Sequence, residues 1–519
     1  LAQGNLEKAE SFAIQAIKLN VKAPGMRKIL GLIKQKQGKR EDAIEYYRAE
    51  LEINPESLDV LTCLGRLCLE QGNSTHAIFY LKKALSIKYT SDCSLLLAQA
   101  YQELGHFREA RNEYKKLIKG DTENKLIAFN AGLCSLKIGE ANEAVEAFKK
   151  AIAIDSEFMD AWGNLGTALM NQGLYKEALE PTRKVVNSHP NNLNANINLG
   201  VIYKEIGSIE LAQKFTLKAL TIDPSEPKAH INLGSIHMES GKYDQALSST
   251  LKCLEIQPNN ATAYINLSSI YIKLGELDKA LRTALKSVEL DPNNAIAYYT
   301  LGRIYKMHHD LPQSLIATLR SIELQPDNAA ALVNLGCIYQ EQGKSGKALD
   351  VTLESLKIDP NCPDAYLNLG SIYKSLGQLD EALKATVKSI NLQPKNSISL
   401  LNLGSIYQEV GELDQALTAT LKSIELEPGN ATAYMNLGSI YRGLENLPEA
   451  LIATLKSIEL KANNSVAYLN LGSIYKEIGD LDELVNSFEK SKHLDPEDIS
   501  HHLNAKSLIQ DIQTSQRDI

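Results

Sequence analysis

The segment LNLGSIY occupies Leu367–Tyr373 and recurs at Leu401–Tyr407 and Leu469–Tyr475, while MNLGSIY occupies Met435–Tyr441. These copies follow one another at a constant spacing of about 34 residues. A fixed period of that length indicates an array of helical hairpins, in which each repeat stacks on its neighbours. Such arrays present long surfaces that bind other chains, and they seldom enclose a catalytic pocket.

The rest of the chain fits the same period when the first repeat begins at Pro24. The repeats then begin at residues 24, 58, 91, 125, 159, 193, 227, 261, 295, 329, 363, 397, 431 and 465, and positions are counted from these starts. Positions 8 and 15 are mostly Gly, position 20 is mostly Ala, and position 32 is often Pro. We expect glycine 15 to end the first helix in a left-handed conformation and proline 32 to end the second. Glycine 8 and alanine 20 are expected to face each other where the two helices touch.

The marks of the repeat divide the chain into four parts. Residues 1–23 are expected to hold the second helix of a truncated repeat, and residues 24–158 four divergent repeats. Residues 159–498 hold the regular repeats. Residues 499–519 lack the repeat marks but place apolar residues at helical spacing, which predicts a C-terminal capping helix and tail. Because the chain begins at Leu1 in the middle of a repeat, we expect it to be a fragment.

The pattern is that of the tetratricopeptide repeat, a family that the chain resembles over essentially its whole length. Trp162, Leu165 and Gly166 even supply the family's W-x-x-L-G opening. The resemblance implies an all-α solenoid, a right-handed superhelix of about fourteen helix–turn–helix repeats. One departure concerns position 24, which is usually aromatic in the family. It is threonine at Thr182, Thr216, Thr250, Thr318, Thr352, Thr386, Thr420 and Thr454. A smaller residue is expected to bring helices closer and to change the superhelical pitch.

Composition restricts the partners. The net charge is −8, from 63 acidic and 55 basic residues, and no basic stripe favours nucleic acid. The chain has no apolar run long enough to span a membrane. Its 7 cysteines have irregular spacing and are interpreted as reduced packing residues, which favours a cytoplasmic location. We expect no cofactor and no metal, because neither His308 with His309 nor His230 with His237 has a matched third ligand.

Position 6 carries the strongest functional signal. Asparagine occupies it at Asn130, Asn164, Asn198, Asn232, Asn266, Asn334, Asn368, Asn402, Asn436 and Asn470. Asparagine is a mediocre helix former, so its recurrence here suggests a role other than folding. A carboxamide both donates and accepts hydrogen bonds, so a row of them can bind the backbone of an extended peptide whatever its sequence. The series resembles the asparagine ladder on the repeat superhelix of the O-linked N-acetylglucosamine transferase. An alternative is that these asparagines bond neighbouring helices and only fix the repeat geometry.

Three neighbouring positions complete the expected groove. Position 5 is apolar in the later repeats, position 9 is mostly Ser, and position 12 is often Lys, Gln or Arg. These positions predict an apolar strip beside the amides and a thin basic rim. Repeat domains that clamp chaperone C-termini carry Lys at position 5 and Asn at position 9, so the pattern disfavours that function.

The sequence contains no GxxxxGK[ST], HExxH or GxSxG motif. We therefore predict a non-catalytic scaffold that binds extended polypeptide segments along an asparagine-lined groove. It would suit the recognition region of a larger protein-modifying enzyme. The alternative is a structural protein that self-associates into oligomers or fibres through its uniform outer face. Both hypotheses name proteins or peptides as partners.

Overall fold

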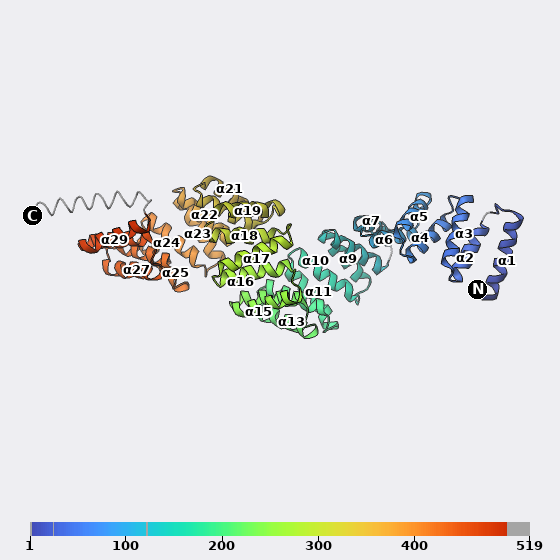
Figure 1. Ribbon diagram of the computed structural model, residues 1–519, viewed down its shortest axis with the longest axis horizontal. Coiled ribbons are helices and arrows are strands. Elements are labelled where there is room, and N and C mark those ends of the chain that lie inside the picture. Colours follow the sequence, from blue (N-terminus) through green and yellow to red (C-terminus); the bar gives the residue numbers. More distant parts are fainter. Residues whose placement is uncertain (1–2, 24, 121–122, 496–519) are drawn as a thin grey trace, which may run out of the picture. The chain divides into compact units, whose positions relative to one another are not determined.

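The computed structural model describes residues 3–23, 25–120 and 123–495, and helices with short connections fill these ranges (Figure 1). The chain divides into two compact halves, Leu1–Pro258 and Asn259–Ile519. The first half contains α1 (Gln3–Leu19), α2 (Met26–Lys36), α3 (Arg40–Ile53), α4 (Leu58–Glu70), α5 (Ser74–Ile87), α6 (Ser91–Glu103), α7 (Phe107–Lys119), α8 (Lys125–Lys137), α9 (Ala141–Ile154), α10 (Met159–Asn171), α11 (Tyr175–Ser188), α12 (Leu193–Glu205), α13 (Ile209–Ile222), α14 (Pro227–Glu239) and α15 (Tyr243–Ile256). The second half contains α16 (Ala261–Lys273), α17 (Leu277–Leu290), α18 (Ala295–Met307), α19 (Leu311–Leu324), α20 (Ala329–Glu341), α21 (Ser345–Ile358), α22 (Pro363–Ser375), α23 (Leu379–Leu392), α24 (Ser397–Val410), α25 (Leu413–Leu426), α26 (Ala431–Gly443), α27 (Leu447–Leu460), α28 (Ser465–Ile478) and α29 (Leu481–Leu494).

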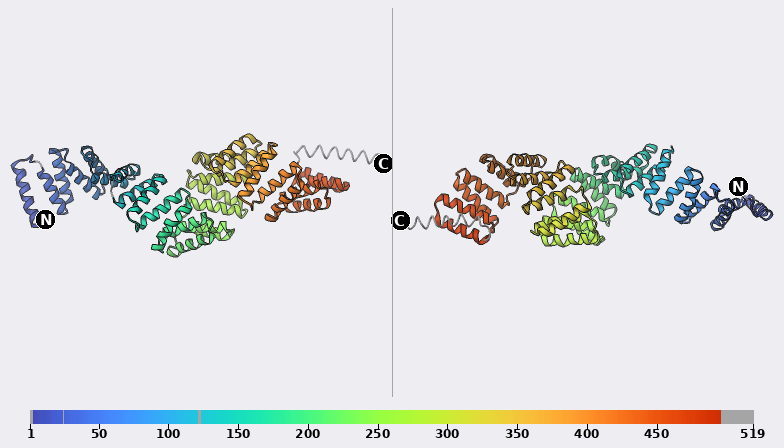
Figure 2. Two further views of the ribbon diagram at one scale, coloured as in Figure 1. Left: turned by 180° about the vertical axis from the view of Figure 1, so that it is seen from behind. Right: turned by 90° about the horizontal axis from the view of Figure 1, so that it is seen from above.

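From α2 onward the helices pack in consecutive pairs, and each pair is one repeat of the sequence frame. Within each half, successive pairs stack on one another, as Figure 2 shows from two directions. The first helices of neighbouring repeats also contact each other, for example α18 with α20 and α20 with α22. The prediction of an all-α repeat solenoid is confirmed. The predicted capping helix, residues 499–519, lies outside the described residues.

Position 15 ends the first helix as the sequence predicts. Gly343 has a φ of 73° and Gly377 a φ of 73°, both in the left-handed region that glycine adopts without steric cost. The two repeats without glycine keep the same conformation, with φ 60° at His309 and 58° at Glu445. The turn geometry is therefore set by the repeat as a whole, and these two side chains adopt it at some cost in strain.

Asparagine at the end of a repeat caps the first helix of the next one. The Asn328 side chain accepts a hydrogen bond of 3.1 Å from the Ala331 backbone N–H at the start of α20. Asn464 does the same for Ala467 at the start of α28, at 3.3 Å. Each cap satisfies one of the N–H groups that the first turn of a helix leaves unpaired. These caps hold the first helices, which carry the candidate site, in their register.

The close contact between the two helices of a repeat differs from the expected one. A Cβ atom on Gly336 would lie 2.5 Å from Thr352 Oγ1, and 3.5 Å from the backbone carbonyl oxygen of Ala348. Glycine 8 thus faces the side chain at position 24 rather than the alanine at position 20. In the first and fourth repeats an aromatic ring fills the same place, and a Cβ on Gly132 would lie 2.6 Å from Phe148 Cε1.

Candidate functional site

The asparagines at position 6 lie on the first helices, and several of them bond the preceding repeat. Asn334 Nδ2 donates to Thr318 Oγ1 at 2.8 Å, and Asn368 Nδ2 donates to Thr352 Oγ1 at 3.0 Å. Further along, the corresponding bonds join Asn402 to Thr386 at 3.2 Å and Asn470 to Thr454 at 3.4 Å. We call this contact, from the position-6 amide to the hydroxyl at position 24 of the preceding repeat, the inter-repeat hydrogen bond.

Burial varies among the asparagines of the later repeats. Asn334 and Asn368 are each only 5% exposed, whereas Asn402 and Asn436 are half-buried. Asn436 differs from the others, because it has no hydrogen bond within the described residues and Thr420 Oγ1 is buried without a partner. The bonded members of the series therefore contribute to packing between repeats, while peptide binding by these asparagines stays a prediction. The sequence alternative, that they join neighbouring helices, describes those members correctly.

The remaining asparagines occupy more varied surroundings. Asn198 Nδ2 donates to Thr167 Oγ1 of the preceding repeat at 3.2 Å, and Asn232 Nδ2 reaches the Ile197 carbonyl oxygen at 3.5 Å. Asn164 Nδ2 instead donates to the Asp160 carbonyl oxygen of its own helix at 2.8 Å. Asn130 lies beside Tyr114, whose hydroxyl donates to Gln102 Oε1 at 2.9 Å and whose pKa is raised by burial. Asn266 is half-buried on α16.

The residue types at position 24 and at position 6 of the next repeat are related from Thr182 onward, but not throughout the divergent part, where Cys63 follows Tyr47 and Asn164 follows Phe148. Tyr114 and the threonines carry hydroxyls, and asparagine follows each of those within the same half. Ala284 has no hydroxyl, and the next repeat carries Thr300, whose Oγ1 donates to its own helix at the Ile296 carbonyl oxygen. Leu81 is followed by Leu96 in a shared apolar cluster. The single interruption in the late asparagine series therefore falls where its partner is missing.

The expected basic rim is largely neutralised. Position 12 of one repeat forms ion pairs with glutamate at position 13 of the next, as in Lys374–Glu409 at 2.9 Å and Lys306–Glu341 at 3.8 Å. The side chain at position 12 also donates to the serine at position 9 of the next repeat, for example from Gln408 Nε2 to Ser439 Oγ at 2.8 Å. The glutamates at position 13 are thus partners of the rim. At this exposure each pair contributes about 0–1 kcal/mol.

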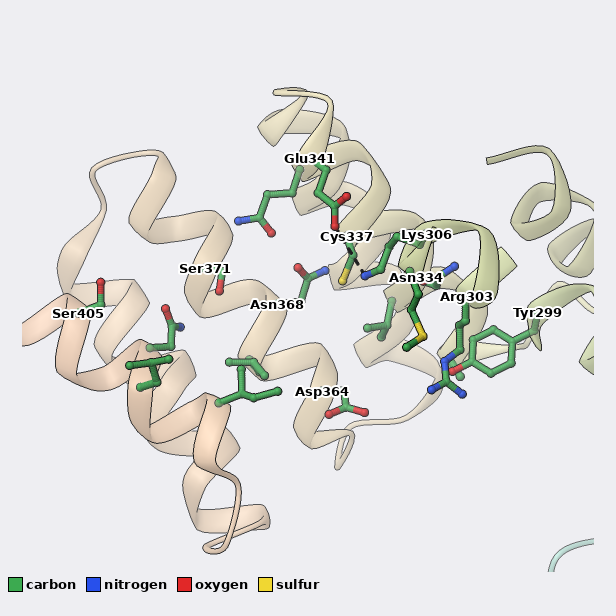
Figure 3. Close-up of a pocket in the computed structure, with 18 of the residues that line it drawn as sticks. Tyr299, Arg303, Lys306, Asn334, Cys337, Glu341, Asp364, Asn368, Ser371 and Ser405 are labelled. Atoms are coloured by element: carbon green, nitrogen blue, oxygen red, sulfur yellow. Dashed lines mark ion pairs between the residues drawn. The ribbon is translucent and has the colours of Figure 1, made fainter. Parts of the chain in front are cut away.

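A groove of about 610 Å³ nevertheless opens on the first helices of the second half (Figure 3). Its lining comes from five successive first helices, α18, α20, α22, α24 and α26. The lining includes Val333, Leu367 and Leu401 from position 5, and Asn334, Asn368, Asn402 and Asn436 from position 6. Val333 is 8% exposed, and Leu367 and Leu401 are half-buried, so the apolar strip is partly covered by packing.

Charged and aromatic groups lie at one end of this groove. The Arg303 guanidinium lies 5.6 Å from the centroid of the Tyr299 ring, an arrangement in which cation and ring attract each other. Burial raises the pKa of Tyr299, and the charge of Arg303 opposes that rise. Figure 3 shows Arg303 beside Tyr299, with Asp364 across from them. Sequence reasoning missed Arg303, although arginine at position 9 in a series of serines is visible in the sequence.

Two smaller cavities include other members of the asparagine series. Asn164 and Asn198 line a cavity of about 340 Å³ between α10 and α12, together with Asp160 and Lys228. Asn130 lines another beside Tyr114. The series is thus divided among separate surfaces, and Asn334, Asn368, Asn402 and Asn436 share a groove with an apolar strip.

Among the described residues, no His, Cys, Asp and Glu side chains form a cluster that would hold a metal ion. No helix within the same range has the length and apolarity needed to cross a bilayer. The 7 cysteines are free thiols. Burial raises the pKa of the Cys337 thiol in the groove, so that thiol is disfavoured as a thiolate nucleophile.

Comparison with known proteins supports the fold. Tetratricopeptide repeat profiles match residues 30–91, 95–157, 143–192 and 401–467, then 193–226 and 465–498, and also 237–304, 317–350 and 363–396. A search of curated protein sequences finds no match. The chain is similar to a solved structure described as "Crystal structure of APC/C hetero-tetramer Cut9-Hcn1", with a TM-score of 0.63 and 16% identity. The alignment covers 95% of this chain and 98% of that chain, and at this identity it shows the shared fold. Repeats of this kind support a protein–protein interaction scaffold, and the chain belongs to the tetratricopeptide repeat family.

Proposed function

We propose that the chain is a non-catalytic scaffold that binds an extended polypeptide segment along the groove on α18, α20, α22, α24 and α26. The observation that carries the proposal is the groove itself, which combines half-buried apolar side chains with carboxamides over five successive repeats. An apolar surface interrupted by a few convergent polar groups is typical of binding sites. The resemblance of the asparagine series to a transferase's repeat region supports the further proposal that a protein-modifying enzyme uses this chain for recognition.

The asparagines contribute unequally in this proposal. The inter-repeat hydrogen bond holds the Nδ2 groups of Asn334 and Asn368, so these two residues mainly shape the floor of the groove. Asn436 has no such bond, and Asn402 is half-buried, so their carboxamides are the ones that meet the peptide backbone. Each peptide hydrogen bond contributes about 0.5–1.5 kcal/mol net, and ordering the peptide offsets part of that. Moderate affinity and broad sequence tolerance follow.

The proposal is tested by selecting peptides from a randomised library displayed on phage and measuring their affinity for two variants. Ser371→Trp places a large side chain in the groove at a residue that has no hydrogen bond within the described residues. Lys388→Trp places the same side chain on the exposed face of α23 and is the matched control. We expect the selected peptides to lose at least about tenfold in affinity for Ser371→Trp and to bind Lys388→Trp as they bind the wild type. Equal affinity for all three proteins contradicts the proposal.

A second candidate function is lateral self-association, which a separate observation favours. Position 25 of the second helices carries large apolar side chains that are 38–45% exposed, namely Leu285, Leu319, Leu353, Val387, Leu421 and Leu455. A regular apolar row on an outer face is typical of a surface that another protein covers. Light scattering across protein concentration tests this candidate, and a constant monomer mass contradicts it.

A further inference from the structure

The ninth repeat, which begins at residue 295, departs from its neighbours at several positions on its first helix. Position 5 is Tyr299 where the others are aliphatic, and position 6 is Thr300 where they carry asparagine. Position 9 is Arg303 where most late repeats carry serine, and position 13 is Met307 where glutamate recurs. Of these, Tyr299, Arg303 and Met307 line the groove. The departures therefore give one end of the groove a chemistry of its own.

An earlier repeat shows what arginine at position 9 does when a partner is present. Arg66 also occupies position 9, and its Nη2 lies 3.0 Å and 2.7 Å from the two carboxylate oxygens of Asp92. Asp92 occupies position 2 of the following repeat. At the same place after Arg303 stands Ala330, whose methyl group cannot pair with a guanidinium. Within the described residues Arg303 has no ion pair or hydrogen bond, although Tyr299 holds its guanidinium in place.

We propose that Arg303, supported by Tyr299, is the subsite for an anionic side chain of the bound peptide. This inference rests on the proposed function, because it names a residue of the peptide that the groove receives. The peptide's carboxylate or phosphate takes the place that the Asp92 carboxylate takes beside Arg66. A guanidinium presents several N–H donors in a plane, so it binds either anion through two parallel hydrogen bonds. Lys306 is already paired with Glu341, so among the described residues that line the groove Arg303 is the cation without an ion pair.

The spacing of the repeats sets the rest of the sequence that fits. The first helices α18, α20 and α22 contact one another in series, and packed helices lie about 8–10 Å apart. An extended peptide advances about 3.3 Å per residue, so it crosses one repeat in about three residues. An anionic residue at Arg303 therefore places apolar residues about three and six positions away, beside Val333 and Leu367. Asp364 is exposed across the groove and disfavours a second acidic residue there.

The test uses four degenerate peptide pools that share randomised flanks and differ in one fixed central residue: glutamate, glutamine, phosphoserine or serine. Anisotropy titrations with the whole chain measure each pool's apparent affinity. We expect about a tenfold preference for glutamate over glutamine, or for phosphoserine over serine, at low salt. The larger of the two preferences identifies the anion. This inference is overturned, while the proposed function stands, if the wild type binds all four pools without preference and Ser371→Trp binds them more weakly. If the chain binds none of the four pools, both this inference and the proposed function are overturned.

Two variants keep the test independent of folding. Ala330→Asp supplies the carboxylate that Arg66 already has, and Ala330 is exposed in the first turn of α20, where an acidic residue is favoured. We expect this variant to lose the preference for the anionic pools while it binds the neutral pools as the wild type does. Asp364→Asn removes a like charge and is expected to strengthen binding of the anionic pools about twofold. An Ala330→Asp protein that keeps the full preference contradicts the role of Arg303.

Discussion

Repeat 4 and repeat 10 fill the same space between their helices with different chemistry. In repeat 4 the ring of Phe148 packs fully buried against Gly132. In repeat 10 the smaller Thr352 takes the place of that ring, and its hydroxyl accepts the amide of Asn368 from the next repeat. Repeat 4 thus relies on an apolar side chain within one repeat, and repeat 10 on a hydrogen bond between two. The role of the residue at position 6 therefore depends on the residue at position 24 of the preceding repeat.

The largest expected effect comes from removing the ring. Phe148→Ala deletes a fully buried aromatic side chain and leaves a cavity beside Gly132, so we expect the local stability of α8 and α9 to fall by about 3–5 kcal/mol. Hydrogen exchange of the α8 and α9 backbone amides measures this loss directly. Protection that stays at the wild-type level contradicts the assigned role of Phe148. Thr352→Ala is the matched change in repeat 10, and it deletes far less apolar volume.

The next effect tests the close approach of the helices in repeat 10. In Gly336→Ala the new Cβ atom would lie 2.5 Å from Thr352 Oγ1 and 2.7 Å from Asn368 Nδ2. We expect a loss of about 1–3 kcal/mol from this overpacking, despite the better helix propensity of alanine. Thr352→Ala in the same protein removes one of the two clashing atoms and should recover part of the loss. If the double variant is no more stable than Gly336→Ala, position 24 does not limit the approach.

A smaller effect is expected from removing the inter-repeat hydrogen bond. Thr352→Val keeps the shape of the side chain but leaves the buried Asn368 amide without its acceptor, which costs about 1–3 kcal/mol. A double-mutant cycle of Thr352→Val with Asn368→Ala should show a coupling energy of about 0.5–1.5 kcal/mol in urea unfolding followed by hydrogen exchange. The control pair is Thr182 and Asn198, since Asn198 bonds Thr167 instead. Equal coupling in both pairs contradicts the comparison.

The smallest effect comes from repairing the interruption in the series. Ala284→Thr together with Thr300→Asn restores the pair of residue types that the neighbouring repeats carry. We expect the double change to stabilise α17 and α18 by about 0.5–1.5 kcal/mol, the net contribution of one hydrogen bond. Either single change should give less, because each supplies only one partner. Hydrogen exchange of these two helices checks the difference, and a destabilised double variant would mean that the interruption itself is adapted to its site.

The sequence was sufficient for the fold because its signals are local. Glycine at position 15 reports a backbone conformation, and even His309 and Glu445 adopt the left-handed turn that the repeat requires. Asparagines at the end of a repeat, such as Asn328, cap the helices that follow them. The candidate site was harder to predict because its contacts cross from one repeat to the next. Asn368 is recognisable as a polar residue on a first helix, but its partner Thr352 becomes apparent only when two repeats are stacked.

Arg303 shows the same limit. Its type and position are visible in the sequence, yet its lack of a partner follows from Ala330 in the next repeat and from the contrast with Arg66 and Asp92. Such departures are difficult to recognise in a regular array, because the repeat pattern is defined by the residues that recur. The residues that break the pattern within one repeat are the ones that give the groove its chemical preference.

The most direct test of the peptide groove is a side-chain amide NMR spectrum of asparagine-labelled protein, titrated with a peptide selected from the library. We expect saturation to shift the side-chain resonances of Asn402 and Asn436, which are half-buried in the groove, while those of Asn130 and Asn164 in the first half stay in place. Saturable binding that leaves Asn402 and Asn436 unshifted would contradict this expectation.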